Sequence, residues 1–299
     1  MPCLYPRTVR VKNKLGEINY IQVPCGKCYA CQQTKSLEFA FRLYQEVNHS
    51  MNAYFVTLTY EDSNLSFALN EESGEMQPCL VKKDLQDFFK RLRQYCTRQI
   101  DKEMKLKYFA CGEYGFKFHR PHYHFILCSS NILLNVEQAL EACEKSWNLG
   151  FVEIKPAHQN NIHYVTGYVT EKLMETQDIR FRESEFIPIV PEFRLLSNNL
   201  GLSYVDEFRQ YHLADRSRFF CNYNGHKINM PRYYRERLYN PTDRALHNLR
   251  VQQETDNKFK PIEEDLEEFR LYEKKKRASE REFIRRKRAQ ILKRKSHNG

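Results

Sequence analysis

Apolar side chains recur every three or four positions in three stretches of the chain: residues 36–48, 82–100 and 136–147. This period is typical of an amphipathic helix that buries one face. Asn135 precedes the third stretch and is a favourable N-cap residue, while Gly150 follows it and favours a helix end. The pattern therefore predicts three helices in this part of the chain.

Four further segments, residues 54–60, 107–113, 122–128 and 151–155, are expected to be strands, and the first of them is rich in β-branched and aromatic residues. Such a composition favours strands. The connection from Gly115 to Pro121 predicts that the second and third segments form a hairpin. Residues 61–78 are polar and rich in turn-forming residues, which predicts a long loop. Strands that alternate with helices in this way indicate an α+β or α/β layered fold.

Two histidines and a glutamate come together in the expected hairpin. His122 and His124 are two residues apart on one strand, so their side chains project from the same face. If the hairpin closes about residues 117–118, Glu113 lies opposite His122 on that face. Two imidazoles and a carboxylate can then bind a divalent cation and leave positions open for substrate and water. The structural alternative is one buried and one exposed histidine without a metal.

A second group of residues has a spacing of four. Tyr164, Tyr168 and Lys172 form one stripe if the segment is a helix. On a strand, which the β-branched content and Gly167 also allow, the three would share a face but lie farther apart. Next to a metal-bound phosphodiester, a tyrosine can act as a nucleophile in strand scission, with Lys172 neutralising phosphate charge. The alternative is that both tyrosines are ordinary residues at the edge of a core.

Cysteines near the N-terminus have the spacing of metal ligands. Cys25, Cys28 and Cys31 follow Pro24, and Cys3 lies upstream. Four thiolates of this kind can form a structural Zn²⁺ site. The closely spaced triplet also resembles part of an iron–sulfur pattern. The remaining alternative is a set of reduced, partly buried thiols.

Composition and charge indicate which kinds of molecule the protein is expected to bind. The chain has 299 residues, a formal net charge of +10 and a pI near 9.0, which favours a polyanion such as nucleic acid. No apolar run approaches the ~20 residues that span a bilayer, so we expect no membrane partner. No signal-peptide pattern opens the chain, and ten cysteines without export indicate reduced thiols in a cytoplasm.

The C-terminal third of the chain combines a hairpin with basic segments. Residues 219–223 and 226–230 predict two strands joined by a type I′ turn at Asn224-Gly225. Cations and aromatic rings then alternate, which suits phosphate contact and base stacking, or else a surface helix with buried tyrosines. The expected DNA-binding residues are Arg232, Tyr233, Tyr234, Arg235, Lys274, Lys275, Lys276, Arg285 and Arg286. The last five lie in a charged tail that is expected to be helical or disordered, and the alternative for part of this tail is a solubilising role.

Several motifs in this order resemble the replication initiators of the microviruses, the small circular single-stranded-DNA bacteriophages, within the HUH endonuclease superfamily. The first motif is Phe55-Val-Thr-Leu-Thr-Tyr60, the second is His122-Tyr123-His124, and the third is the tyrosine pair with Lys172. Further segments resemble those of gokushovirus-like initiators: Gly112–Gly115, Arg120-Pro121, Pro24–Cys28 and Asn224–Tyr234. The resemblance extends from about residue 3 to 240.

This resemblance implies a five-stranded antiparallel sheet flanked by helices, with the metal site on central strands and the tyrosines on an adjacent helix. It implies Mg²⁺ or Mn²⁺ at His122, His124 and Glu113, with His119 as the alternative third ligand, although the same donors suit Zn²⁺. One tyrosine would nick single-stranded or replicative-form viral DNA through a 5′-phosphotyrosine, and the other would resolve the finished circle. Host helicase and polymerase are the implied partners, in the cytoplasm of a bacterial host.

The expected organisation has four parts: a Cys-rich knuckle and first helix (1–48), an HUH endonuclease core (49–178), an extension with a hairpin (179–250) and a charged tail (251–299).

Two other functions agree with the same residues. A plasmid relaxase or transposase would use the same chemistry at a different DNA site. A non-catalytic zinc-knuckle protein would bind nucleic acid without cleaving it.

Overall fold

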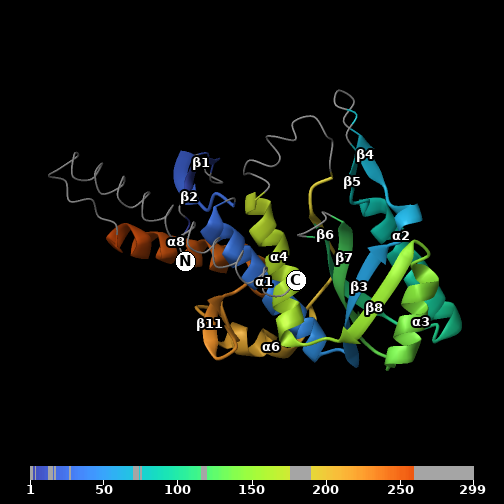
Figure 1. Ribbon diagram of the computed structural model, residues 1–299. Coiled ribbons are helices and arrows are strands. Elements are labelled where there is room, and N and C mark those ends of the chain that lie inside the picture. Colours follow the sequence, from blue (N-terminus) through green and yellow to red (C-terminus); the bar gives the residue numbers. More distant parts are fainter. Residues whose placement is uncertain are drawn as a thin grey trace. The chain divides into compact units, whose positions relative to one another are not determined.

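The computed structural model describes residues 3, 5–12, 16, 18–26, 28–69, 74, 76–115, 120–175 and 190–258 (Figure 1). The chain divides into two compact units. The first unit is residues 1–209 with 222–226, and the second is residues 210–221 with 227–299. The four-part organisation expected from the sequence stays a prediction.

A five-stranded antiparallel sheet forms the centre of the first unit. Its strands in spatial order are β8 (Gly150–Pro156), β3 (Asn52–Tyr60), β7 (Pro121–Ser129), β6 (Leu106–Tyr114) and β9 (Phe193–Leu196). Every neighbouring pair is antiparallel. The prediction of an α+β fold with such a sheet is confirmed. The short edge strand β9 does not follow from the sequence pattern, because four residues are too few to show an alternation.

Helices cover both faces of this sheet (Figure 1). They are α1 (Tyr29–Asn48), α2 (Lys82–Gln99), α3 (Val136–Ser146) and α4 (Gln159–Glu175). Helices α2 and α3 lie on one face, where their apolar side chains form the main core with β3, β6 and β7. Helices α1 and α4 lie on the other face and contact each other through Ser36 Oγ, which donates to the Thr166 carbonyl oxygen at 3.1 Å.

The ends of the helices agree with local capping chemistry. Asn135 Oδ1 accepts a hydrogen bond from the Gln138 backbone N–H at 2.8 Å, and Gln138 Oε1 accepts one from the Asn135 N–H at 3.2 Å. This capping box confirms the predicted start of α3. Helix α1 begins seven residues before the predicted position, because the cysteine segment leads directly into it, with Cys28 as the N-cap residue.

The first unit also contains two small strand pairs and a 3-10 turn. Strands β1 (Arg7–Lys12) and β2 (Ile18–Val23) form an antiparallel ribbon near the N-terminus. The segment expected to be one long loop instead contains a 3-10 turn, η1 (Asp62–Asn64), and the paired strands β4 (Phe67–Leu69) and β5 (Met76–Pro78). The loop prediction is therefore wrong in part, since strands of three residues leave no periodic signal in a polar sequence.

The C-terminal elements are α6 (Ser203–Ala214), β10 (Phe220–Tyr223), β11 (His226–Asn229), α7 (Arg232–Leu238) and α8 (Pro241–Lys258). Strands β10 and β11 form a two-stranded sheet, as predicted. Asn224 and Gly225 have φ values of 50° and 77°, and a type I′ turn requires positive φ at both positions. In the described ranges, no helix combines the length and apolar character needed to cross a membrane.

A substitution at Gly150, the first residue of β8, tests how tightly the edge of the sheet is packed. The φ of this glycine is +154°, and a Cβ atom there would overlap the backbone nitrogen of Glu61 and the carbonyl oxygen of Thr59. We expect Gly150→Ala to lower the free energy of unfolding by about 1–3 kcal/mol, because backbone atoms must move to admit the methyl group. Urea unfolding followed by circular dichroism measures this change.

Gly167→Ala in α4 is the matched control. Its Cβ atom would meet Ser36 Oγ at an ordinary 3.9 Å, and alanine is about 0.5–1 kcal/mol more favourable than glycine inside a helix. This variant should be as stable as the parent protein or more so. Equal stability of Gly150→Ala and the parent would contradict the packing described for the edge of β8.

Candidate active site

The two histidines lie on the face of β7 that is turned toward α4. The neighbouring side chains Tyr123, Phe125 and Leu127 are fully buried in the core on the opposite face. His122 and His124 are partly exposed, and the ring of His124 lies 5.4 Å from the ring of Tyr164 on α4. The predicted placement of both histidines on one face is therefore confirmed.

Tyr123 fixes β7 between the two histidines. Its hydroxyl donates to the Val81 carbonyl oxygen and accepts from the Val81 backbone N–H, both at 2.9 Å. The same hydroxyl lies 2.8 Å from the hydroxyl of Tyr60 on β3. Because the tyrosine is completely buried, this network ties the strand to its neighbours from the side opposite to the histidines.

Glu113 occupies the position that the hairpin prediction gives it. It is directly opposite His122 in the pairing of β6 with β7, which confirms the predicted register. Its Oε1 atom lies 3.0 Å from His124 Nε2, and the side chain is almost completely buried. The second oxygen, Oε2, is buried and has no hydrogen-bond partner among the described residues. A buried carboxylate oxygen in this state is suited to bind a cation.

Two threonines of β3 hold the histidine rings. Thr57 Oγ1 lies 2.9 Å from His124 Nδ1, and Thr59 Oγ1 lies 3.1 Å from His122 Nδ1. When Nδ1 is held in this way, Nε2 is the ring nitrogen suited to ligate a metal. The spacing of the motifs does not predict the role of the two threonines. Like the two histidines, however, they are two residues apart, and each is directly opposite one histidine in the pairing of β3 with β7.

The turn end of the hairpin leaves space beside His122. The Gly115 backbone N–H donates to the Arg120 carbonyl oxygen at 2.8 Å and closes the ladder. A Cβ atom at Gly115 would lie 3.3 Å from His122 Nε2, which is tighter than an ordinary contact. Glycine at this position therefore keeps the ligand nitrogen accessible. Residues 116–119, which include the alternative ligand His119, lie outside the described residues.

Tyr164 brings a hydroxyl group to the same carboxylate. The segment is a helix, so the strand alternative is excluded, and the Tyr164 hydroxyl donates to Glu113 Oε1 at 3.0 Å. Its ring stands nearly perpendicular to the rings of His124 and Phe55, which stack on each other with their centroids 5.7 Å apart. The residue as a whole is 40% exposed, but burial of its hydroxyl and the charge of Glu113 raise the pKa of Tyr164. The phenol is therefore protonated at neutral pH in this arrangement.

Tyr168 and Lys172 lie on α4 one and two turns after Tyr164. The structure describes the backbone of α4 to Glu175 but side chains only to Gly167, so the side chains of both residues lie outside the described part. Their common stripe with Tyr164 stays a prediction.

The histidine–glutamate group is looser than a closed metal shell. The centroids of the His122 and His124 rings are 6.2 Å apart. Among the described residues, the four cysteines near the N-terminus are the one group of three or more potential metal ligands whose donor atoms all lie within 4.8 Å of one another. The histidine–glutamate group is not as compact. The donor set of two imidazoles and one carboxylate nevertheless suits a divalent cation in its chemistry, and Oε2 of that carboxylate has no hydrogen-bond partner among the described residues.

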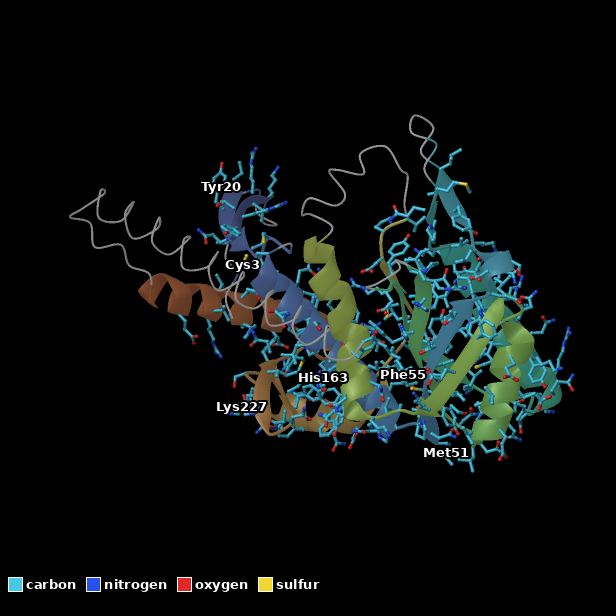
Figure 2. All side chains as sticks on the ribbon, in the orientation of Figure 1. Cys3, Tyr20, Met51, Phe55, His163 and Lys227 are labelled. Carbon is cyan, nitrogen blue, oxygen red and sulfur yellow. The ribbon has the colours of Figure 1, made fainter. Side chains whose placement is uncertain are left out.

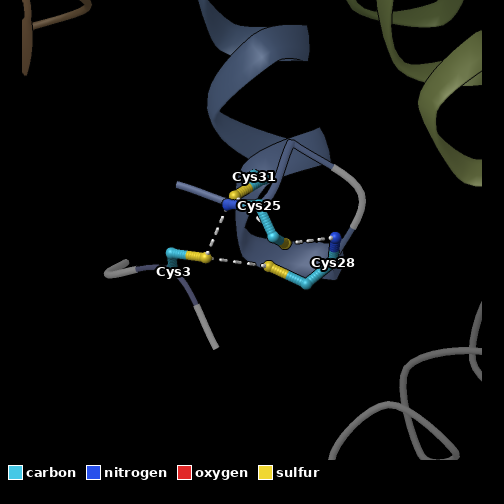
Figure 3. A group of neighbouring side chains, drawn as sticks. All are labelled: Cys3, Cys25, Cys28 and Cys31. Carbon is cyan, nitrogen blue, oxygen red and sulfur yellow. Dashed lines mark hydrogen bonds between the residues drawn. The ribbon is translucent and has the colours of Figure 1, made fainter. Parts of the chain in front are cut away.

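Four cysteine sulfurs form a compact cluster at the start of α1 (Figure 3). The Sγ atoms of Cys3 and Cys28 are 3.8 Å apart, and those of Cys25 and Cys31 are 3.9 Å apart. The Cys25 backbone N–H donates to Cys3 Sγ at 3.2 Å, and the Cys28 N–H donates to Cys25 Sγ at 3.3 Å. Burial raises the pKa of Cys31, so without a metal this thiol is protonated at neutral pH. The predicted grouping of the four cysteines is confirmed, and the cluster can hold a metal ion.

The predicted DNA-binding residues on α7 differ in accessibility. Tyr234 is completely buried, so its ring is not available for a base, and its assignment as a DNA-binding residue is wrong. Arg232 Nε is paired with Glu236 Oε1 at 2.6 Å. The guanidinium of Arg237 lies 3.6 Å from the centroid of the Tyr233 ring. The other five, Lys274, Lys275, Lys276, Arg285 and Arg286, lie in the part of the charged tail beyond Lys258, which is outside the described residues.

Residues 53–173 match the family described as replication-associated protein ORF2/G2P. The matched range begins in β3 and ends in α4. It contains both histidines, Glu113 and both tyrosines of the candidate site.

Curated relatives carry similar names. The chain is 29% identical over 237 residues to replication-associated protein ORF2 of Spiroplasma virus 4, which covers 74% of this chain and 69% of that protein. It is 26% identical to replication-associated protein ORF4 of Chlamydia phage 1, covering 72% of this chain and 53% of that protein. For replication-associated protein VP4 of Bdellovibrio phage phiMH2K, the identity is 27%, with 74% and 68% covered.

No solved structure matches the chain. The relatives are replication proteins of microvirus phages, the group to which the sequence motifs point. The resemblance to microvirus replication initiators is thereby confirmed: the chain is similar to the replication-associated proteins of these phages.

Proposed function

We propose that this protein initiates rolling-circle replication as an HUH-type endonuclease and strand transferase. One observation carries the proposal: the Tyr164 hydroxyl and His124 Nε2 both lie 3.0 Å from the same oxygen of Glu113. The proposed nucleophile and two proposed ligands of a divalent cation thus meet at one oxygen atom. The similarity to phage replication-associated proteins supports single-stranded or replicative-form viral DNA as the substrate.

His122, His124 and Glu113 would hold Mg²⁺ or Mn²⁺. A bound cation withdraws charge from the phosphoryl oxygens of the scissile phosphodiester and aligns it for in-line attack. Thr57 and Thr59 would keep the imidazole rings in the tautomer and orientation that present Nε2. Lys172, two turns after Tyr164 on the same helix, is proposed to neutralise phosphate charge.

The cleavage step transfers a phosphoryl group from one oxygen to another. The phenol oxygen of Tyr164 or Tyr168 forms a bond to phosphorus, and the bond from phosphorus to the 3′ oxygen breaks. The phenol proton is delivered to solvent, and the departing oxygen takes one up to become a free 3′ hydroxyl that primes synthesis. The 5′ phosphate stays on the tyrosine, so the energy of the broken bond is kept for rejoining. The second tyrosine would attack the next strand when the circle is complete.

The cysteine cluster is proposed to hold one structural Zn²⁺. With Zn–S bonds of about 2.3 Å, the edges of a tetrahedron of thiolates are about 3.8 Å long. The observed separations of 3.8 Å and 3.9 Å agree with this value. The two backbone N–H groups that point at sulfur atoms would stabilise thiolate charge.

Cellular context belongs to the same proposal. The substrate would be met in the cytoplasm of a bacterial host, where thiols stay reduced. A primer-template made by nicking needs strand separation and extension, so host helicase and polymerase are the proposed partners.

A covalent adduct is the direct product of the proposed step. With Mg²⁺ or Mn²⁺ and single-stranded oligonucleotides tiled across the phage genome, we expect a protein–DNA adduct on a denaturing gel at one origin sequence. Replacing both Tyr164 and Tyr168 by Phe should abolish it, because no phenol remains to attack. Tyr211→Phe, at an exposed tyrosine of α6, is the control and should form the adduct as the parent does. Adduct formation by the double variant would rule out these nucleophiles.

The threonine contacts predict a change in metal dependence. Thr57→Val keeps the shape of the side chain but removes the hydroxyl next to His124 Nδ1. We expect about 10- to 100-fold weaker metal binding, seen as a higher Mn²⁺ concentration for half-maximal adduct formation. Thr57→Ser, which keeps the hydroxyl, should restore the parental value. A Val variant with the parental Mn²⁺ requirement would show that the threonine does not position the ligand.

Metal analysis tests the cysteine cluster. The purified protein should contain one zinc ion per chain, and Cys28→Ser should lose most of it, because one of four sulfur ligands is missing. Cys79→Ser is the control, since this thiol lies outside the cluster and serine can still accept from the Val190 N–H. Iron with acid-labile sulfide in place of zinc would contradict the assignment of zinc. A native protein without metal would contradict metal binding by the cluster altogether.

A further inference from the structure

The ribbon formed by β1 and β2 is attached at both ends to the cysteine cluster. Cys3 lies four residues before β1, and Cys25 lies two residues after β2. Their sulfurs meet those of Cys28 and Cys31 at the start of α1. The cluster therefore fixes the open end of the ribbon to a helix of the first unit, while the ribbon itself extends from it (Figure 2).

The two faces of the ribbon differ in chemistry. Arg10 is directly opposite Tyr20, and Lys12 is directly opposite Ile18. Directly opposed residues of an antiparallel pair share a face, and so do residues two apart along a strand. Two cations and an aromatic ring are therefore on one face. The opposite face carries Val9 and Val23, which are partly buried.

The cationic face is open to solvent. Tyr20 is 68% exposed, more than any other large hydrophobic side chain in the described part of the chain. Arg10 and Lys12 are exposed as well. Residues 5–23 hold four basic residues and one acidic residue, so the whole segment attracts anions. A ring left in water between cations has the composition of a nucleic-acid contact, because bases can stack on the ring while phosphates meet the cations.

We propose that this face of the ribbon binds single-stranded DNA, with a base stacked on Tyr20 and adjacent phosphates at Arg10 and Lys12. The choice of DNA as the polyanion rests on the proposed function. Arg10 and Lys12 are two residues apart on β1, which separates them by about 6.6 Å along the strand. This distance is close to the separation of successive phosphates in an extended strand. The contact is independent of sequence, because every base has a face that stacks and every nucleotide has a phosphate.

Binding of a fluorescent oligothymidine, measured by anisotropy without Mg²⁺ or Mn²⁺, tests the ring. We expect Tyr20→Ala to bind about 5- to 150-fold more weakly than the parent, since one stacked base is lost. Tyr20→Phe keeps the ring and should bind within about twofold of the parent. Equal affinities of the Ala and Phe variants would overturn the proposal.

A salt series tests the cations. The double variant Arg10→Gln/Lys12→Gln should reduce the slope of log affinity against log salt by about 1.4, because two phosphate contacts to a single strand are lost. The matched control is Lys90→Gln/Lys102→Gln, which removes the same charge at exposed positions on and just after α2. Loss of slope in both variants, or in neither, would overturn the proposal. Zinc content and thermal unfolding confirm that each variant is folded.

Adduct formation at saturating DNA separates this proposal from the proposed function. Tyr20→Ala should still form the covalent adduct at high DNA concentration, because the ribbon contributes no atom to the reaction. If this variant binds DNA more weakly but neither it nor the parent forms an adduct, DNA binding by the ribbon is supported and the nicking mechanism is contradicted. If Tyr20→Ala binds DNA and forms the adduct as the parent does, the nicking mechanism is supported and DNA binding by the ribbon is contradicted.

Discussion

The candidate site depends on one buried carboxylate. Glu113 Oε1 accepts a hydrogen bond from the Tyr164 hydroxyl at 3.0 Å and lies at the same distance from His124 Nε2. A strand of the sheet and the helix that covers it therefore meet at a single oxygen atom. The other oxygen is buried without a hydrogen-bond partner in the described residues, which is unfavourable unless a cation or a further donor joins it. The same group thus links the position of the phenol to the proposed binding of a cation.

The sheet makes this arrangement possible through its register. Glu113 faces His122 from β6, while Thr57 and Thr59 face the two histidines from β3. A shift of one residue in either pairing would move the histidines into the core, where Tyr123 now lies. The buried hydrogen bonds of Tyr123 oppose such a shift from the core side. The core between the sheet, α2 and α3 therefore has a functional consequence on the opposite face, although none of its side chains reaches the site.

Much of the site follows from the sequence, and the exceptions have physical causes. The period of two in His122 and His124 and a hairpin centred near residue 117 are sufficient to predict Glu113 as their neighbour. Thr57 and Thr59 could not be predicted in the same way, since their contacts depend on a pairing between strands far apart in the chain. Tyr234 was assigned to DNA because composition does not distinguish a buried ring from an exposed one. The short strands β4, β5 and β9 left no periodic signal, whereas the longer strands did.

The central claim is that a cation and the Tyr164 phenol share Glu113. The most direct measurement is an anomalous difference map from crystals that contain Mn²⁺. The account predicts a peak within bonding distance of His124 Nε2 and a Glu113 oxygen, with His122 as a further ligand and the Tyr164 hydroxyl beside it. A Mn²⁺ ion bound elsewhere, with Glu113 contacting only Tyr164 and His124, would contradict it.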